Sequence, residues 1–180
     1  MAEPPPGRLR GLRTVAIALA VAVAPHVQFL PVWVDLLLGS VIAWRTVADA
    51  RGWPLPPKWL RVTVTLAATA VVLGTYHTLN GLEAGTALLV LMAGVKLLET
   101  RSARDLAVLL FIAWFLIYAA LLRSEALAQL PWLVASALLT TGALLRVHAG
   151  SAGESSGTVA RRTLALTLQA LPLALALFLL

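Results

Sequence analysis

The chain has 180 residues, of which 60% are hydrophobic and 12% charged, and its formal net charge is +6. A soluble domain carries about 25% charged residues, and no soluble fold of this size could bury so much apolar surface. Because the apolar residues form blocks separated by short polar breaks, we predict an all-α, polytopic transmembrane helix bundle in contact with the lipid bilayer. The basic residues lie between these blocks, where they set membrane topology, so we expect no nucleic-acid partner.

The chain begins with residues 1–11, which we expect to be a cytoplasmic tail, and continues into a first span over about 12–24. Its basic residues, its apolar run and the small residues at 22–24 are also typical of a signal peptide. Pro25 would directly follow the cleavage site and should fit a peptidase poorly, so we predict an uncleaved span. Pro25 and Pro31 bracket a break before the second span.

Six more apolar blocks follow, and two of the connections between them have a distinct composition. Residues 51–58 are rich in proline and cannot be helical. Residues 148–158 are rich in Gly and Ser and predict a flexible cytoplasmic linker. We therefore predict a transmembrane domain over residues 12–180, with about seven spans at 12–24, 32–48, 59–76, 84–98, 103–122, 130–145 and 163–180.

Charge predicts which side of the membrane each connection faces. With seven spans and a cytoplasmic N-terminus, every Lys and Arg except Arg123 falls on the inner side, as the positive-inside rule requires. If the first two spans were one helix, Arg8, Arg10 and Arg13 would move to the outer side. That helix would also have to continue through two prolines. We therefore predict a multi-pass inner-membrane protein with its N-terminus in the cytoplasm.

The densest group of polar side chains lies in the turn between the fourth and fifth predicted spans, and it comprises Lys96, Glu99, Arg101, Ser102, Arg104 and Asp105. Ser102 and Asp105, three residues apart, predict a capping box that opens the fifth span. Lys96 and Glu99 lie one helical turn apart and can pair. A second pair, Arg101 with Asp105, can form across the turn. Two interpretations stay open: a hairpin that only fixes topology, which we favour, and a docking site for a cytoplasmic partner.

A second polar group falls on the predicted outer face and comprises His26, Asp35, His77, Asn80 and Glu83. Two histidines and two carboxylates could bind zinc or relay protons, but their spacing fits no metal motif. The chain contains no cysteine, so it has no thiolate nucleophile and no cysteine-ligated metal. We therefore predict no catalytic residue, no cofactor and no metal in this chain.

The stretch from Gly81 to Asp105 reads GLEAGTALLVLMAGVKLLETRSARD. Its AG pair, its KLLE segment and its R-x-x-R-D ending resemble the N-terminal membrane domain of the bacterial transglutaminase-like TgpA family. Other matching pieces are Pro25-His26, Arg51-Gly52-Trp53-Pro54 and Gln169-Ala170-Leu171-Pro172. The resemblance covers the chain from about Thr14 onward.

The resemblance implies a membrane anchor for a periplasmic domain of papain/transglutaminase type, which carries a Cys-His-Asp triad. Full-length members resemble enzymes of the protein-glutamine gamma-glutamyltransferase type. Because this chain has no cysteine, we expect the catalytic domain to be missing and the chain to be truncated. The family also implies a MoxR-type ATPase as a cytoplasmic partner. A small stand-alone transporter or lipid-handling protein is the alternative; an intramembrane enzyme is disfavoured because no paired ionisable groups lie at depth.

Overall fold

A computed structural model describes residues 11–76, 81–123, 129–148 and 156–179, and within these residues the chain forms seven α-helices and no β-strand. The helices are α1 (Leu12–Val23), α2 (Val32–Arg51), α3 (Lys58–Tyr76), α4 (Leu82–Glu99), α5 (Ala103–Arg123), α6 (Leu130–His148) and α7 (Ser156–Leu179), and a 3₁₀ turn, η1 (Ala24–His26), follows α1. The prediction of an all-α fold is confirmed for this part of the chain.

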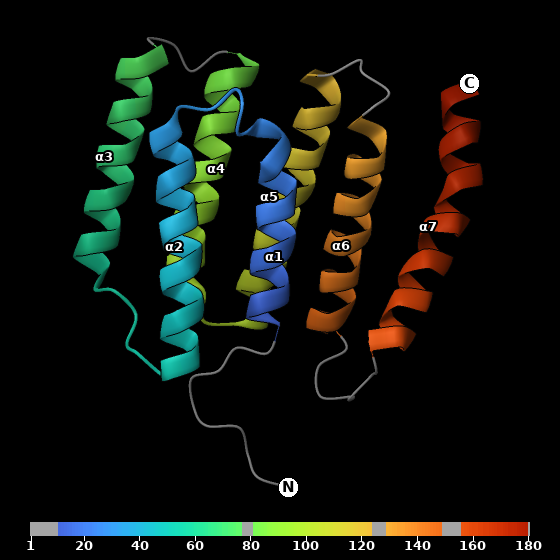
Figure 1. Cartoon of the computed structure of the whole chain (residues 1–180), viewed down its shortest axis with the longest axis horizontal. Helices are drawn as coiled ribbons and strands as arrows, with labels where there is room; N and C mark the ends of the chain where they lie inside the picture. The colour runs from blue at the N-terminus through green and yellow to red at the C-terminus, as the bar shows by residue number, and fades with distance from the viewer. Residues whose placement is uncertain (1–10, 77–80, 124–128, 149–155, 180) are drawn as a thin grey trace, which may run out of the picture.

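Consecutive helices run in opposite directions, as Figure 1 shows. The starts of α1, α3, α5 and α7 therefore share one end of the bundle with the last residues of α2, α4 and α6. We call this the lower end, after its place in Figure 1, and the opposite end the upper end. α1 packs against α5 and α6, α2 and α3 pack against α4, and α7 packs on α6 at the edge of the bundle.

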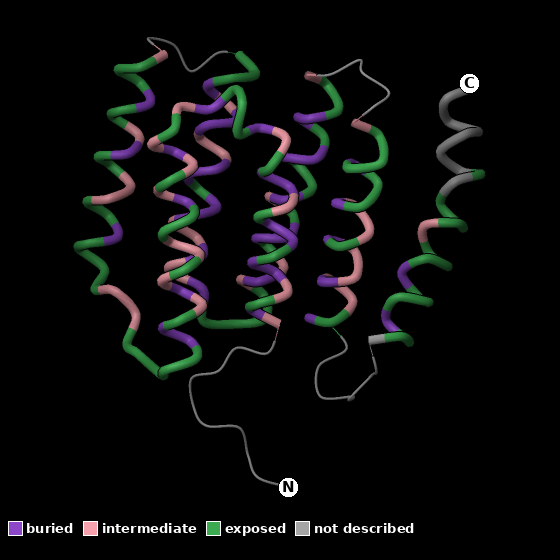
Figure 2. The backbone as a smooth tube through the Cα atoms, viewed as in Figure 1, coloured by how far each residue is buried: buried purple, intermediate pink, exposed green. Residues whose placement is uncertain are grey.

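The core lies around α5, against which α1, α4 and α6 pack. Its fully buried side chains include Leu12, Leu19, Val90, Leu97, Leu109 and Leu116. Figure 2 shows buried positions on the facing sides of the helices and exposed positions on their outer sides. Many of those outer positions are large and apolar: Trp59 is 69% exposed and Leu66 is 66% exposed. An apolar exterior of this extent is suited to lipid rather than to water.

Local sequence signals explain where the first helices end. Pro25 is accommodated in the 3₁₀ turn that follows α1, and Pro31 stands immediately before the first residue of α2. The predicted break between the first two helices is thereby confirmed. α2 continues to Arg51 and α3 begins at Lys58, so the first and last residues of the stretch 51–58, predicted to be non-helical, lie in helices. Gly52 follows α2 with a left-handed φ of 68°, a conformation that glycine adopts at no steric cost.

The predicted linker over 148–158 is too long at both of its ends. α6 continues to His148, and α7 already begins at Ser156, so residues 156–158 are helical. Ser and Thr are common in loops, but they are also preferred at helix N-termini, and composition does not distinguish the two. The helix start is stabilised by packing, because Val159 and Thr163 are buried.

Three of the described helices, α3, α5 and α6, are long and apolar enough to cross a membrane. α1 is apolar but shorter, and α2 and α4 carry charged residues toward their lower ends. Every described Lys and Arg except Arg123 lies in the lower part of the bundle. The fold therefore separates a cation-rich lower end from an upper end with one cation among its described residues.

Candidate functional site

The turn between α4 and α5 is closed by a capping box, as the sequence predicts. The backbone N–H of Ser102 donates to Asp105 Oδ2 at 3.1 Å, and that of Asp105 donates to Ser102 Oγ at 3.3 Å. Asp105 Oδ2 also accepts from Ser102 Oγ–H at 2.8 Å and from the backbone N–H of Arg101 at 3.1 Å. Asp105 thus satisfies N–H groups that the start of α5 would otherwise leave without a partner.

Asp105 also joins the two helices of the hairpin, because its Oδ1 accepts a hydrogen bond from Lys96 Nζ at 2.6 Å. The two ion pairs that the spacing allows, Lys96 with Glu99 and Arg101 with Asp105, do not form among the described residues. Reversal of the chain brings the first turn of α5 beside the last turn of α4, and a short charge-assisted bond is stronger there than a pair along one helix. Arg101 bonds to Asp105 through its backbone N–H instead of its guanidinium.

Glu99 pairs with a residue of α3 instead. Its Oε1 lies 3.3 Å from Arg61 Nη1. The Arg61 side chain is 8% exposed, whereas that of Glu99 is 43% exposed. The pair therefore connects a buried guanidinium to a carboxylate that water still reaches.

A third pair lies on α2 and reaches the same turn. Arg45 Nη2 donates to the carbonyl oxygen of Thr100 at 3.0 Å, and Arg45 Nη1 lies 3.7 Å from Asp49 Oδ1. Both side chains are almost completely buried. Because Thr100 ends α4 and its hydroxyl donates to the Lys96 carbonyl at 2.7 Å, Arg45 fastens α2 to the last turn of α4.

These three pairs form a single group at the lower end, which we call the charge cluster: Arg45, Asp49, Arg61, Lys96, Glu99 and Asp105. It connects α2, α3, α4 and α5 and balances three cations with three anions. Sequence reasoning did not assign Arg45, Asp49 or Arg61 to the site. Arg45 and Asp49 nevertheless carry a sequence signal, since two opposite charges four residues apart are rare inside an apolar helix.

The other two cations of the turn, Arg101 and Arg104, are exposed. Neither forms an ion pair with any residue in the described part of the chain. The turn thus consists of a neutral, hydrogen-bonded interior and two guanidinium groups that face outward. The contacts of the turn are hydrogen bonds and ion pairs that hold the helices together.

The group predicted on the outer face is brought together only in part. His77 and Asn80 lie outside the described residues, and Asp35 lies in the first turn of α2. His26 is completely buried and donates through Nε2 to the Leu116 carbonyl at 2.9 Å. Among the described residues, no set of three His, Asp or Glu side chains could hold a metal ion.

Glu83 belongs to a different contact, at Arg123. Arg123 Nη1 lies 3.7 Å from Glu83 Oε1, and the guanidinium stacks 4.5 Å above the Phe29 ring. We call His26, Phe29, Glu83 and Arg123 the upper clasp, because they join the loop after α1 to the upper ends of α4 and α5. The Glu83 side chain is 62% exposed, so this ion pair is weakly stabilising.

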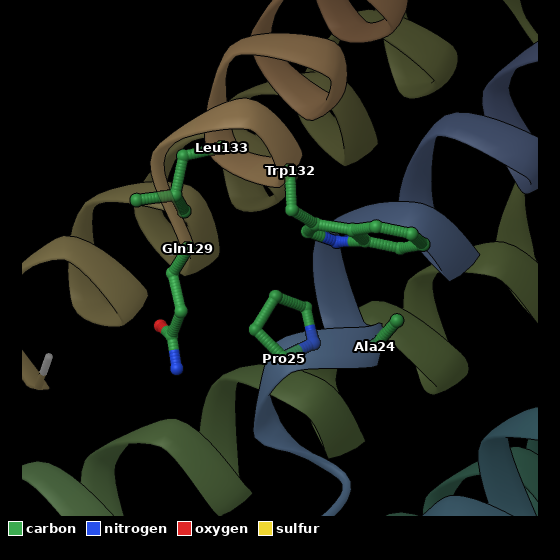
Figure 3. A pocket seen from close by; sticks show the side chains of 5 residues that line it. All are labelled: Ala24, Pro25, Gln129, Trp132 and Leu133. Atoms are coloured by element: carbon green, nitrogen blue, oxygen red, sulfur yellow. The ribbon is translucent and has the colours of Figure 1, made fainter. Parts of the chain in front are cut away.

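A cavity of about 300 Å³ lies at the upper end between α6 and the turn after α1. Figure 3 shows the Trp132 indole beside Pro25 and Ala24, and the amide of Gln129 is the most polar side chain that the figure labels. The indole Nε1–H donates to the Val21 carbonyl at 3.1 Å, which ties α6 to α1. The described lining residues provide no acid, base or nucleophile.

Comparison with known proteins gives two matches. The sequence profile of the family described as the TgpA N-terminal domain matches residues 14–180. The chain is also 28% identical, over 163 residues, to a protein-glutamine gamma-glutamyltransferase of Pseudomonas aeruginosa. That alignment covers 91% of this chain but only 24% of the relative, so the chain spans about a quarter of the curated protein that it matches. No solved structure matches the chain.

Proposed function

The chain belongs to the TgpA N-terminal domain family, and from this membership we propose that it is the membrane anchor of a transglutaminase-like protein. In this proposal all seven helices cross the bacterial inner membrane and the lower end faces the cytoplasm. The upper end then holds a periplasmic domain of papain/transglutaminase type close to the membrane. The name of the Pseudomonas aeruginosa relative supports the class of the attached enzyme.

The distribution of charge is the observation that carries this orientation. Every described Lys and Arg except Arg123 lies toward the lower end. Because consecutive helices run in opposite directions, this asymmetry means that cation-rich connections alternate with cation-poor ones along the chain. Cytoplasmic connections of multi-pass proteins carry the excess of Lys and Arg. The distribution of Lys and Arg thus supports a lower end that faces the cytoplasm.

The charges of α2 and α4 do not prevent these helices from crossing a membrane. Arg45 and Asp49 are paired with each other, and Lys96 and Glu99 are paired with residues of α5 and α3. Charged groups that face the bundle interior and pair there are tolerated within spans. α1 has 12 helical residues, about 18 Å at 1.5 Å per residue, and requires local thinning of the bilayer.

Cysteine labelling tests the orientation cleanly, because the chain has no cysteine of its own. Ala103→Cys places a thiol in the exposed lower turn, and Leu130→Cys places one at the upper end of α6. In intact cells whose outer membrane has been permeabilised, we expect an impermeant maleimide to label the Leu130→Cys variant only. Labelling of the Ala103→Cys variant alone would refute the orientation.

A fusion tests the anchor role directly. β-Lactamase joined after Leu180 should confer ampicillin resistance and sediment with the membrane fraction, because the upper end would hold it in the periplasm. The control fusion ends at His148, the lower end of α6, and should leave the cells sensitive. Resistance from the His148 fusion and not from the Leu180 fusion would contradict the proposal.

We further propose that the outward-facing guanidiniums of Arg101 and Arg104 dock a cytoplasmic MoxR-type ATPase through its acidic surface. Two exposed cations without an ion-pair partner among the described residues are what such docking requires. The Arg101→Gln/Arg104→Gln variant should retain a purified MoxR-type ATPase less well in a pull-down at low salt. Arg161→Gln, which removes an exposed arginine of α7, is the matched control. Equal retention by all three proteins would refute docking at this turn.

The transporter alternative receives no support from the cavities. In the part of the chain that the structure describes, cavities lie at α1–α2, at α1–α6–α7, at the upper end of α6 and at the start of α7, and their described lining residues include no Asp, Glu or His. A proton-coupled transporter normally requires a carboxylate or an imidazole in such a position, because the guanidinium of an arginine stays protonated. The cavity linings are therefore more consistent with an anchor.

A further inference from the structure

Two grooves run along α1 on the face formed by α2, α1, α6 and α7, which lie in front in Figure 1. The first, of about 390 Å³, lies between α1 and α2 and is walled by Ile42 and Val47. The second, of about 460 Å³, lies between α1, α6 and α7 and is walled by Leu139 and Leu164. Ile17, whose side chain is 58% exposed, lines both grooves and separates them. The face thus presents two neighbouring apolar channels.

Small residues create the space in both channels. Ala16 and Ala20 of α1 line the first groove, and Gly142 of α6 lines the second. A Cβ atom on Gly142 would lie 3.3 Å from Thr163 Oγ1, so α6 and α7 approach closely there. This close approach gives the second groove a floor, so it is not simply a gap between two separate helices.

Each groove has one guanidinium in its lining, and both arginines belong to the lower end. Arg13 lies in the first turn of α1 and lines the first groove; Arg146 lies in the last turn of α6 and lines the second. Both side chains are exposed. An apolar channel that ends at a cation matches the polarity of a phospholipid, in which acyl chains join a phosphate at the membrane surface.

We propose that the two grooves hold the acyl chains of one anionic phospholipid, whose phosphate lies between Arg13 and Arg146. Two channels on either side of Ile17 match a two-chain lipid better than they match a single helix, which would need one continuous groove. A net negative headgroup is required because a zwitterionic lipid would bring its own cation toward two arginines. That this lipid comes from the inner leaflet rests on the orientation given under Proposed function.

Native mass spectrometry of the purified chain tests the site. The chain is extracted in mild detergent and offered equal amounts of phosphatidylglycerol and phosphatidylethanolamine, and we expect it to retain phosphatidylglycerol preferentially. Arg13→Gln and Arg146→Gln should each reduce that preference roughly fivefold, which corresponds to about 1 kcal/mol per arginine at a membrane surface. Arg104→Gln is the control, because Arg104 is an exposed arginine that lines neither groove, and it should leave the preference unchanged.

Substitutions that fill the grooves test the binding of the acyl chains independently of the binding of the phosphate. Val47→Trp and Leu139→Trp each place an indole in one groove and should reduce retention of both lipids. Val134→Trp is the matched control, because Val134 lies on α6, is 54% exposed and lines neither groove. Circular dichroism of each variant verifies that the helices are intact before the spectra are compared.

Several results would overturn the proposal. These are equal retention of the two lipids, arginine variants that behave like Arg104→Gln, and displacement of the bound lipid by glycerol phosphate, which has no acyl chains. Disulfide-linked dimers of a Leu139→Cys variant in the membrane would show that a second copy fills the groove. None of these measurements depends on orientation. Selective retention together with a failed β-lactamase fusion would therefore refute the anchor orientation and leave the lipid site standing.

Discussion

The two ends of the bundle hold their charged side chains in different ways. At the lower end, the charge cluster distributes three ion pairs over four helices, and Arg45, Asp49 and Arg61 are nearly inaccessible to solvent. At the upper end, Arg123 is held by one largely exposed carboxylate and by the face of an aromatic ring. The lower end is thus a buried network, whereas the upper end is a single clasp.

The number of cations at each end of the bundle determines the kind of partner that each cation needs. Several cations at one end repel one another unless each has its own acid or carbonyl partner, so the lower end supplies Asp49, Glu99, Asp105 and the Thr100 carbonyl. A single cation meets no such repulsion, and a ring together with a hydrated carboxylate is enough to hold it. Substitutions should therefore destabilise the lower end more than the upper end.

The largest effect is expected at Arg45. Arg45→Met removes the donor to the Thr100 carbonyl and the cation beside buried Asp49, and should lower the free energy of unfolding by about 3 kcal/mol. Unfolding in mixed micelles with increasing dodecyl sulfate, followed by circular dichroism, measures the change. Arg45→Lys keeps the positive charge but has a single terminal nitrogen in place of the two that contact Thr100 and Asp49. It should therefore give an intermediate loss of unfolding free energy. A loss smaller than that of Arg123→Met, at the upper end, would contradict the expected difference in stability between the two ends.

Asp105 should come next. Asp105→Ala removes the Lys96 bond and the capping box together, and we expect a loss of about 2 kcal/mol in the same unfolding assay. Asp105→Asn keeps a capping acceptor without the charge, so it should recover about half of the loss. If the Asn variant were no better than the Ala variant, the ion pair alone would account for the stability.

The upper clasp should contribute less. Arg123→Met and Phe29→Leu should each cost about 1 kcal/mol, since both disrupt the same cation–π contact. The double variant should lose little more than either single variant, because each substitution already abolishes the contact. Additive losses in the double-mutant cycle would show that the guanidinium and the ring act separately.

The smallest effect is expected at the outward-facing arginines of the turn. Arg101→Gln together with Arg104→Gln should change the free energy of unfolding by less than about 0.5 kcal/mol, because neither guanidinium has an ion-pair partner among the described residues. A loss comparable to that of Asp105→Ala would mean that these arginines are structural, and the docking proposal would lose its basis.

Most helix boundaries could be predicted because their signals are local. Pro25 and Pro31 act through their own backbone, so they mark the same break in the sequence and in the structure. The capping box is local as well, since Ser102 and Asp105 are three residues apart. The start of α7 could not be predicted in this way, because tertiary packing of Val159 and Thr163 extends a helix into residues whose composition is typical of a loop.

By itself, the sequence determined that the chain is an all-α bundle of apolar helices and that its cations gather at alternate connections. Only the tertiary structure decided the partner of each charge. Spacing along the chain identifies neighbours on one helix, such as Arg45 and Asp49, but the contacts of Lys96 with Asp105 and of Glu99 with Arg61 join different helices. Such contacts depend on how each helix is rotated and placed against the next, which packing of the whole bundle sets.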